Sequence, residues 1–171
     1  MRYVYCPQCG AKLTERPVGD EGLVPFCEKC SRPWFDTFSS CVITAVANEF
    51  GEIALLRQDY LSAQYRVLVS GYMKPGESAE DAAAREVLEE IGLPLETLVF
   101  QKTYPFMRRD QLMIGFLGFC HKAPFRLSKE VDDCAWVPGD QALALMHPVG
   151  SASRDLVERY LAHGLSGGQS C

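Results

Sequence analysis

Residues 71–93 read GYMKPGESAEDAAAREVLEEIGL, and this stretch decides the fold. Residues 79–91 are mostly strong helix formers and include neither glycine nor proline, which predicts a helix. Ser78 is a favourable N-cap, and Asp81 three residues later completes a capping box. Gly92 suits the left-handed position that ends a helix. The sequence therefore predicts a loop followed by a well-defined helix.

Three glutamates of this helix lie on one face, because Glu86, Glu89 and Glu90 are spaced at i, i+3 and i+4. Their repulsion opposes the helix, two of them lie near its negative C-terminal end, and Arg85 relieves only part of the charge. Divalent Mg²⁺ or Mn²⁺ would relieve it, since these ions prefer oxygen ligands and keep waters for phosphate substrates. The alternative is a solvated acidic face, a common fate of charge runs.

The pattern resembles the Nudix box, G-x5-E-x7-R-E-U-x-E-E-x-G-U, where U is a bulky aliphatic residue. All nine specified positions match, namely Gly71, Glu77, Arg85, Glu86, Val87, Glu89, Glu90, Gly92 and Leu93. The resemblance implies an α/β fold, the Nudix α/β/α sandwich with a mixed sheet. It also implies metal-dependent hydrolysis of a nucleoside diphosphate linked to another moiety.

The resemblance assigns roles to residues of the box. It implies that Glu86, Glu89 and Glu90 bind Mg²⁺ or Mn²⁺, that Arg85 orients them, and that Glu77 pairs with Arg85. The metal would lower the pKa of a bound water and neutralise charge on the phosphate. Glu90 is the first choice for the residue that positions or deprotonates the attacking water, with Glu89 as a rival.

Outside the box, the apolar and β-branched pattern predicts five strands, at residues 41–47, 52–57, 66–70, 112–120 and 133–137. Helical spacing follows at residues 140–146 and 153–162.

Two CxxC pairs, separated by 17 residues, lie near the N-terminus: Cys6, Cys9, Cys27 and Cys30. Two such turns supply the tetrahedral four-thiolate shell that Zn²⁺ accepts, and a closed shell makes the zinc structural. A redox CxxC or a disulfide is the alternative. The predicted organisation is a zinc ribbon over 1–36, a Nudix domain over 37–164 and a flexible tail over 165–171.

The NADH pyrophosphatase branch of the Nudix family also carries a four-cysteine ribbon directly before its Nudix domain, and this chain resembles that branch without its extra N-terminal domain. The branch has SQPWPFPxS followed by L-M, where residues 101–110 here read QKTYPFMRRD. Pro105 and Phe106 match, Tyr104 replaces Trp, and about two residues are inserted. Glu130, six residues before Trp136, falls where the branch has a metal-binding Glu, so it is a further candidate ligand or base.

The resemblance further implies a set of substrate-binding residues, several of them aromatic: Phe35, Ser70, Tyr72, Tyr104, Pro105, Phe106, Arg108 and Ser153. Aromatic faces suit nicotinamide or adenine, because base stacking contributes about 1–3 kcal/mol per ring. Arg108 could bind a phosphate or belong to a solvated basic loop.

The leading hypothesis is therefore a metal-dependent pyrophosphohydrolase that cleaves an NAD(H)-type dinucleotide into two mononucleotides. Alternatives within the enzyme class are ADP-ribose, FAD and nucleoside triphosphates, and NAD-capped RNA is a further substrate suggested by the resemblance. A zinc-ribbon binding module with a degenerate Nudix site is the alternative outside that class. Resemblance to dimeric relatives predicts a homodimer.

The composition of the chain limits the classes of binding partner that we expect. The chain has 171 residues, a formal net charge of −5 and a pI near 5.2. Because lysines and arginines are scattered, extensive non-specific nucleic-acid binding is not expected. No apolar run approaches the roughly 18 residues that cross a bilayer, and the first residues lack a signal-peptide pattern. We expect a cytoplasmic protein without a membrane partner.

Overall fold

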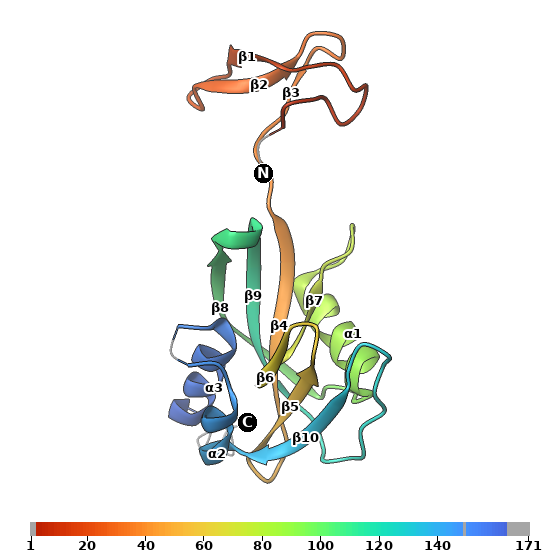
Figure 1. Cartoon of the computed structure of the whole chain (residues 1–171), viewed down its shortest axis with the longest axis vertical. Helices are drawn as coiled ribbons and strands as arrows, with labels where there is room; N and C mark the ends of the chain where they lie inside the picture. Colours follow the sequence, from red (N-terminus) through yellow and green to blue (C-terminus); the bar gives the residue numbers. More distant parts are fainter. Residues whose placement is uncertain (1–2, 149, 164–171) are drawn as a thin grey trace. The chain divides into compact units, whose positions relative to one another are not determined.

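The structure is a computed structural model that describes residues 3–148 and 150–163. The chain forms two compact units (Figure 1). The smaller unit comprises Met1–Ser39 with Met107–Asp110, and the larger comprises Ser40–Phe106 with Gln111–Cys171. The predicted flexible tail, residues 165–171, lies outside the described residues. The predicted domain boundary at residues 36 and 37 stays a prediction.

The smaller unit contains an antiparallel three-stranded sheet in the order β1-β2-β3. Its strands are β1 (Thr14–Pro17), β2 (Leu23–Cys27) and β3 (Arg32–Pro33). Among its described residues, the buried hydrophobic side chains are Val24 and the thiols Cys6 and Cys27. A unit of this size with so small a core needs another source of stability, such as a bound metal.

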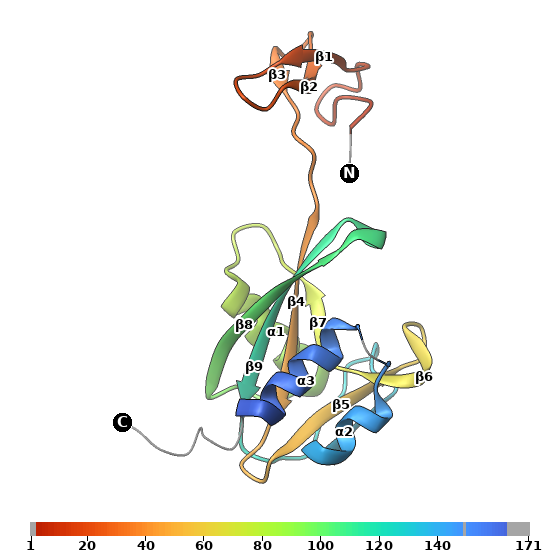
Figure 2. The same cartoon turned by 90° about the vertical axis from the view of Figure 1, so that its left-hand side faces the viewer.

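The larger unit is built on a seven-stranded sheet with the central order β10-β5-β4-β9-β8. Its strands are β4 (Ser39–Ala47), β5 (Glu52–Gln58), β6 (Ser62–Val67), β7 (Val69–Tyr72), β8 (Thr97–Phe106), β9 (Gln111–Phe119) and β10 (Asp133–Pro138). The pairs β8–β9, β4–β7 and β5–β10 are antiparallel, whereas the neighbours β4 and β9 run in the same direction (Figure 2). The sheet is therefore mixed.

Helices cover both faces of this sheet: α1 (Ala79–Ile91) lies on one face, and α2 (Gly139–Leu145) and α3 (Ala152–His163) lie on the other (Figure 2). The alternation of side chains along β4 explains this arrangement. Ile43 and Ala45 pack in one buried cluster with Leu156 of α3, whereas Val46 packs in another with Val87 of α1. The predicted α/β/α sandwich with a mixed sheet is confirmed.

The boundaries of α1 are those that its capping residues predict. The Ser78 side chain accepts a hydrogen bond from the Asp81 N–H at 3.1 Å. At the other end, Gly92 has φ 74 and donates its N–H to the Leu88 carbonyl at 3.1 Å. The Arg126 N–H then donates to the Ile91 carbonyl at 3.0 Å, so a distant loop supplies a donor that the helix end lacks.

Two predictions for the sheet need correction. The strand predicted over 66–70 is divided at Leu68 into β6 and β7, because β6 pairs with β5 while β7 pairs with β4. The ten-residue strand β8 was not predicted. It lies at the sheet edge, is largely exposed and contains Pro105, so it carries none of the buried apolar pattern on which strand prediction depends.

No helix among the described residues combines the length and the apolar composition needed to cross a membrane.

An ion pair fixes the loop that precedes α1. Arg85 Nε donates to Glu77 Oε1 at 2.6 Å, and Arg85 Nη2 donates to Glu77 Oε2 at 2.9 Å. The Lys74 N–H adds a further donor to Glu77 Oε2 at 2.9 Å. Bidentate geometry makes this a strong contact, and the Arg85 guanidinium holds the pKa of Glu77 down at about 2.

We expect Glu77→Gln to reduce the pH dependence of stability in acid. Because the pKa of Glu77 is about 2 in the folded chain and ordinarily 4.5, the ionised pair stabilises the fold above about pH 4.5. That contribution is lost as the pH falls towards 2. Urea unfolding at about pH 3 and about pH 6 measures the difference. Glu80→Gln, which removes an exposed carboxylate from the first turn of α1, is the control and should keep the wild-type difference. Equal pH dependence in Glu77→Gln and wild type would contradict the assignment.

Candidate functional site

Four thiols converge in the smaller unit. The sulfurs of Cys6 and Cys30 lie 3.9 Å apart, those of Cys9 and Cys27 lie 3.5 Å apart, and all four lie within 4.8 Å of one another. A tetrahedral Zn²⁺ with Zn–S bonds of about 2.3 Å separates its sulfurs by about 3.8 Å. Each described cysteine is free of a disulfide. The donor set and its spacing therefore fit a closed four-thiolate zinc site.

The contacts among these thiols and their burial give them different pKa values. The Cys9 side chain, followed by burial, raises the pKa of Cys30 to about 12. Burial also acts to raise the pKa of Cys6, but backbone hydrogen bonds at Cys9 and Gln8 lower it to about 6. Four thiolates cannot coexist at this distance without a cation among them, which agrees with the fit to zinc.

Arg85 organises the glutamates on the exposed face of α1. Its Nη1 donates to Glu86 Oε1 at 2.7 Å and to Glu89 Oε2 at 3.0 Å, while Nη2 reaches the Tyr72 carbonyl at 3.1 Å. Together with its contact to Glu77, one guanidinium therefore serves three carboxylates. This arrangement offsets the repulsion between Glu86 and Glu89 and leaves the charge of the third motif glutamate, Glu90, without a cationic contact from Arg85.

Gly71 makes room for Glu86. A Cβ atom at position 71, on β7, would lie 2.1 Å from the Cδ atom of Glu86. A larger residue would therefore displace this carboxylate, which is only 14% exposed. The glycine that begins the box is required by the close approach of a side chain, and not by its own backbone angle.

Glu90 is buried, with only 5% of its surface exposed. Its Oε1 accepts from Gln58 Nε2 at 3.4 Å, and its Oε2 has no hydrogen-bond partner among the described residues. Burial, with the nearby charges of Glu86 and Glu130, raises the pKa of Glu90 to about 7. A buried carboxylate with a free oxygen and two anionic neighbours fits a divalent cation, which would supply the missing partner.

Backbone contacts hold Glu130 close to Glu90. The Ser128 N–H donates to the Glu90 carbonyl at 3.0 Å, and the Glu130 N–H donates to Ser128 Oγ at 3.3 Å. On the other side, the Asp132 N–H donates to the Arg57 carbonyl at 2.9 Å. The segment that carries Glu130 is therefore attached both to the end of α1 and to the end of β5.

The glutamates are not gathered as closely as the thiols. In the part of the chain that the structure describes, the four cysteines form the one group of three or more candidate ligands whose donor atoms all lie within 4.8 Å. A cation on the α1 face would therefore draw together carboxylate oxygens that lie farther apart, with Arg85 between two of them.

The expected substrate residues of the larger unit lie in two places. The first place is where β7 and β8 end and β9 begins. There the Tyr72 hydroxyl accepts from the Gln111 amide, and Gln111 is the register partner of Phe106. Pro105 precedes Phe106 and is also exposed. By contrast, the Tyr104 hydroxyl donates to Asp155 of α3 at 2.7 Å.

Three further residues of the expected set are placed individually. Ser70 lies on β7 opposite Ile43, and Ser153 lies in the first turn of α3. Arg108 belongs to the short 3-10 helix η1 (Met107–Arg109), and its side chain lies outside the described part of the structure.

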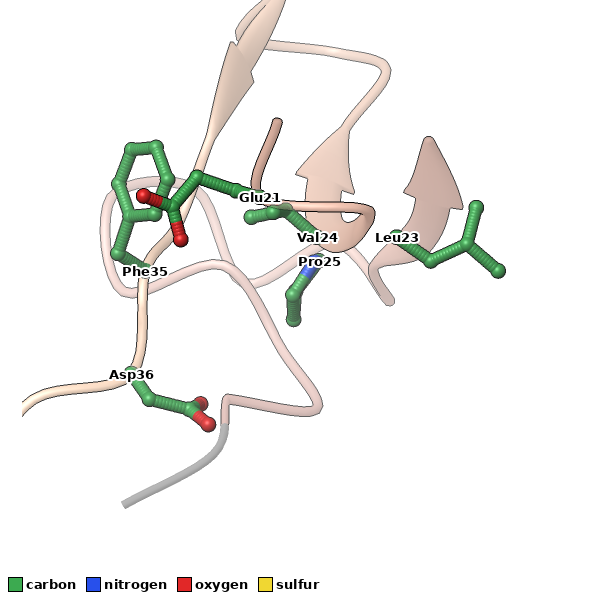
Figure 3. A pocket seen from close by; sticks show the side chains of 6 residues that line it. All are labelled: Glu21, Leu23, Val24, Pro25, Phe35 and Asp36. Atoms are coloured by element: carbon green, nitrogen blue, oxygen red, sulfur yellow. The ribbon is translucent and has the colours of Figure 1, made fainter. Parts of the chain in front are cut away.

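Phe35 belongs to the smaller unit, where its half-exposed ring lines a hollow of about 390 Å³. The walls also include the apolar residues Val24 and Pro25 and the carboxylates of Glu21 and Asp36 (Figure 3). An aromatic ring beside carboxylates could receive a flat, positively charged or amide-bearing ring.

Sequence reasoning missed Gln58 at the candidate site. The available signal was a glutamine at the end of an apolar strand, next to the expected strand 52–57. Such a residue is ordinarily read as the start of a loop, and only the three-dimensional contact with Glu90 shows that it is buried.

Comparison with known proteins gives a consistent result. A family model described as the NUDIX domain matches residues 37–160, which is more than half of the chain. Among curated proteins, the NAD-capped RNA hydrolase NudC of Edwardsiella ictaluri is 27% identical over 164 residues, covering 92% of this chain and 60% of the relative. NudC of Erwinia tasmaniensis is 29% identical, covering 92% of this chain and 59% of the relative. The chain thus spans about three-fifths of the length of these relatives.

Solved structures show the same fold. A NUDIX hydrolase from Nitrosomonas europaea superposes with a TM-score of 0.72 at 19% identity, covering 98% of this chain and 94% of that one. The NUDIX domain of Shewanella oneidensis NrtR, solved with ADP ribose, gives a TM-score of 0.64 at 14% identity, covering 81% and 93%. With the matching box, the α/β/α sandwich and the family model in agreement, this chain belongs to the Nudix family.

Proposed function

We propose that this chain is a metal-dependent pyrophosphohydrolase that cleaves the diphosphate of an NAD-type dinucleotide, either free or as the cap of an RNA. The observation that carries the proposal is the buried Glu90, whose unpartnered oxygen lies on the Nudix helix near Glu86 and Glu130. The curated relatives support the substrate class, since their names describe hydrolysis of NAD-capped RNA.

In this proposal Glu86, Glu89, Glu90 and Glu130 hold Mg²⁺ or Mn²⁺, which when bound lowers the pKa of water and neutralises phosphate charge. The oxygen of the attacking water bonds to one phosphorus while the bond from that phosphorus to the bridging oxygen breaks. Glu90 is the first choice to accept the proton that the water releases, and Glu89 and Glu130 are its rivals. Arg85 keeps Glu86 and Glu89 in place, and Glu77 holds Arg85.

Recognition of the substrate rests on the exposed aromatic residues. Tyr72 and Phe106 are 58% and 41% exposed, so their rings are available to stack on nicotinamide or adenine. Phe35, with its hollow in the smaller unit, and the residues Ser70, Tyr104, Pro105, Arg108 and Ser153 complete the proposed set. ADP-ribose, which the NrtR neighbour binds, shares the adenosine diphosphate group and is the second candidate.

The proposal includes a structural Zn²⁺ on Cys6, Cys9, Cys27 and Cys30, supported by the sulfur spacing. Free thiols suit a reducing compartment, and we propose a cytoplasmic location for that reason. The homodimer expected from the resemblance is part of the same proposal.

Glu90→Gln is expected to reduce Mg²⁺- or Mn²⁺-dependent turnover by about 10²–10⁴-fold, because it removes both the proton acceptor and a ligand charge. The wild-type chain is first incubated with NAD⁺, NADH, NAD-capped RNA, ADP-ribose, FAD and nucleoside triphosphates, and products are separated by chromatography. Two mononucleotides from NAD(H) are the expected result. Glu80→Gln, at an unspecified position of the box on the same helix, should keep wild-type turnover.

Two results would count against this proposal. Unchanged turnover in both Glu90→Gln and Glu89→Gln would show that the assigned glutamates are not the site. Absence of turnover on every substrate, with the ions present, would favour a binding module instead of an enzyme.

We expect about one Zn²⁺ per chain by elemental analysis, lost in a variant that carries Cys6→Ser and Cys27→Ser, because each pair of thiolates then keeps a single member. The matched control is Cys120→Ser, which removes a buried thiol of the larger unit and should keep the zinc. A folded wild-type chain without zinc after refolding in its presence would refute the assignment.

A further inference from the structure

Gln58 is the last residue of β5, and its side chain is only 1% exposed. Burying an amide is unfavourable unless its hydrogen bonds are made inside the protein. Its Nε2 donates to Glu90 Oε1 at 3.4 Å, and its Oε1 has no partner among the described residues. Glu90 is therefore the described group that accounts for this buried glutamine.

The contact joins two side chains that each keep a free acceptor. Gln58 Oε1 and Glu90 Oε2 are both buried and both lack a donor among the described residues. A buried acceptor without a donor calls for a donating water or a cation. If position 58 only had to be filled, methionine or leucine would occupy a similar volume and would leave no unpartnered oxygen.

The end of β5 also holds the segment that carries Glu130. The Arg57 carbonyl accepts from the Asp132 N–H at 2.9 Å, and the Asp59 N–H donates to Asp132 Oδ2 at 2.8 Å. The residues on both sides of Gln58 thus fix the segment of one candidate ligand, while its own amide reaches another. This short stretch of β5 supports two carboxylates that come from distant parts of the sequence.

Another buried polar residue shows what a purely structural role looks like. Asn48 Oδ1 accepts from the N–H groups of Phe50 and Glu52, and its Nδ2 donates to the Glu52 carboxylate at 2.7 Å. Those contacts close a turn and satisfy both ends of the amide. Gln58 instead donates its described hydrogen bond to a glutamate of the box, and its own oxygen has no partner among the described residues.

We propose that Gln58 is a positioning residue for Glu90, and that it sets the orientation in which this carboxylate meets the divalent cation. The inference rests on the proposed function, because it takes Glu90 as a ligand of that cation. Through the same contact Gln58 keeps one carboxylate oxygen engaged, so the other oxygen is directed to the cation.

The test is Mn²⁺ binding to the zinc-loaded full chain, measured by calorimetry for wild type and Gln58→Met. Methionine keeps the length of the side chain and removes the donor. We expect Mn²⁺ to bind about 10–100-fold more weakly, as is typical when a partner of a ligand is removed. Gln58→Met should also lower kcat/KM, and this loss should become smaller as the Mn²⁺ concentration is raised. Thr44→Val, which removes a buried hydroxyl without a partner from β4, is the control and should bind Mn²⁺ as wild type does.

A second comparison shows whether Gln58 acts through Glu90. In the Glu90→Leu background, which removes both oxygens of this side chain, adding Gln58→Met should change Mn²⁺ affinity by about twofold or less, because the contact is already lost. Equal losses in both backgrounds would overturn the proposal. If Gln58→Met does not fold, Gln58→Asn replaces it in both comparisons, since it keeps the amide but withdraws it from Glu90.

The two proposals fail in different ways. If wild type turns over no dinucleotide, the proposed function is wrong, whatever Gln58→Met does. If wild type turns over a dinucleotide and folded Gln58→Met keeps wild-type Mn²⁺ affinity and turnover, the inference about Gln58 alone is wrong.

Discussion

The guanidinium of Arg85 is the group on which the arrangement of the α1 face depends. It binds Glu77 with two hydrogen bonds and reaches Glu86 and Glu89 with a third nitrogen. Without it, adjacent carboxylates on one helix face would repel one another and the preceding loop would lose its anchor. Its donors go to these three carboxylates and to the Tyr72 carbonyl, and the buried Glu90 receives none of them among the described contacts. The divalent-cation site that we propose rests on this arrangement, in which carboxylates paired with Arg85 lie on the same helix as the buried Glu90.

The two units reach stability by different means. The larger unit buries two apolar layers, one on each side of a mixed sheet, and its helices are held by that packing. The smaller unit buries little besides Val24 and two of its thiols among the described residues. With the zinc that we propose, its cohesion would come mainly from the metal that the four sulfurs bind, and loss of that metal would affect this unit far more than the larger one.

Local signals predicted most of the fold. The limits of α1 follow from Ser78 and Gly92, whose capping contacts are made within a few residues, and the strands with continuous apolar runs follow from burial. The edge strand β8 carries no such run, and its position depends on pairing with β9. Prediction of the break at Leu68 would have required knowing that β6 and β7 pair with different strands.

The residues of the candidate site also fall into those that local spacing predicts and those that only tertiary contacts reveal. The box places Arg85 and the glutamates of α1 by spacing alone, because a helix fixes what lies on its face. Glu77 lies in the loop before the helix, and its place follows from its contact with Arg85. Gln58 and Ser128 could not be found so, since each reaches Glu90 across more than thirty residues of sequence. Their roles follow from tertiary contacts to the buried end of α1. For Gln58, the sequence offered only a weak signal, namely a polar residue at the end of an apolar strand.

The most direct test of the account is the position of Mn²⁺ in crystals of the chain, located by its anomalous scattering after soaking. The account predicts a peak among the carboxylates of Glu86, Glu89, Glu90 and Glu130, with the Gln58 amide still on Glu90. A crystal saturated with Mn²⁺ that shows no peak on this face, or shows the ion only elsewhere on the chain, would contradict it.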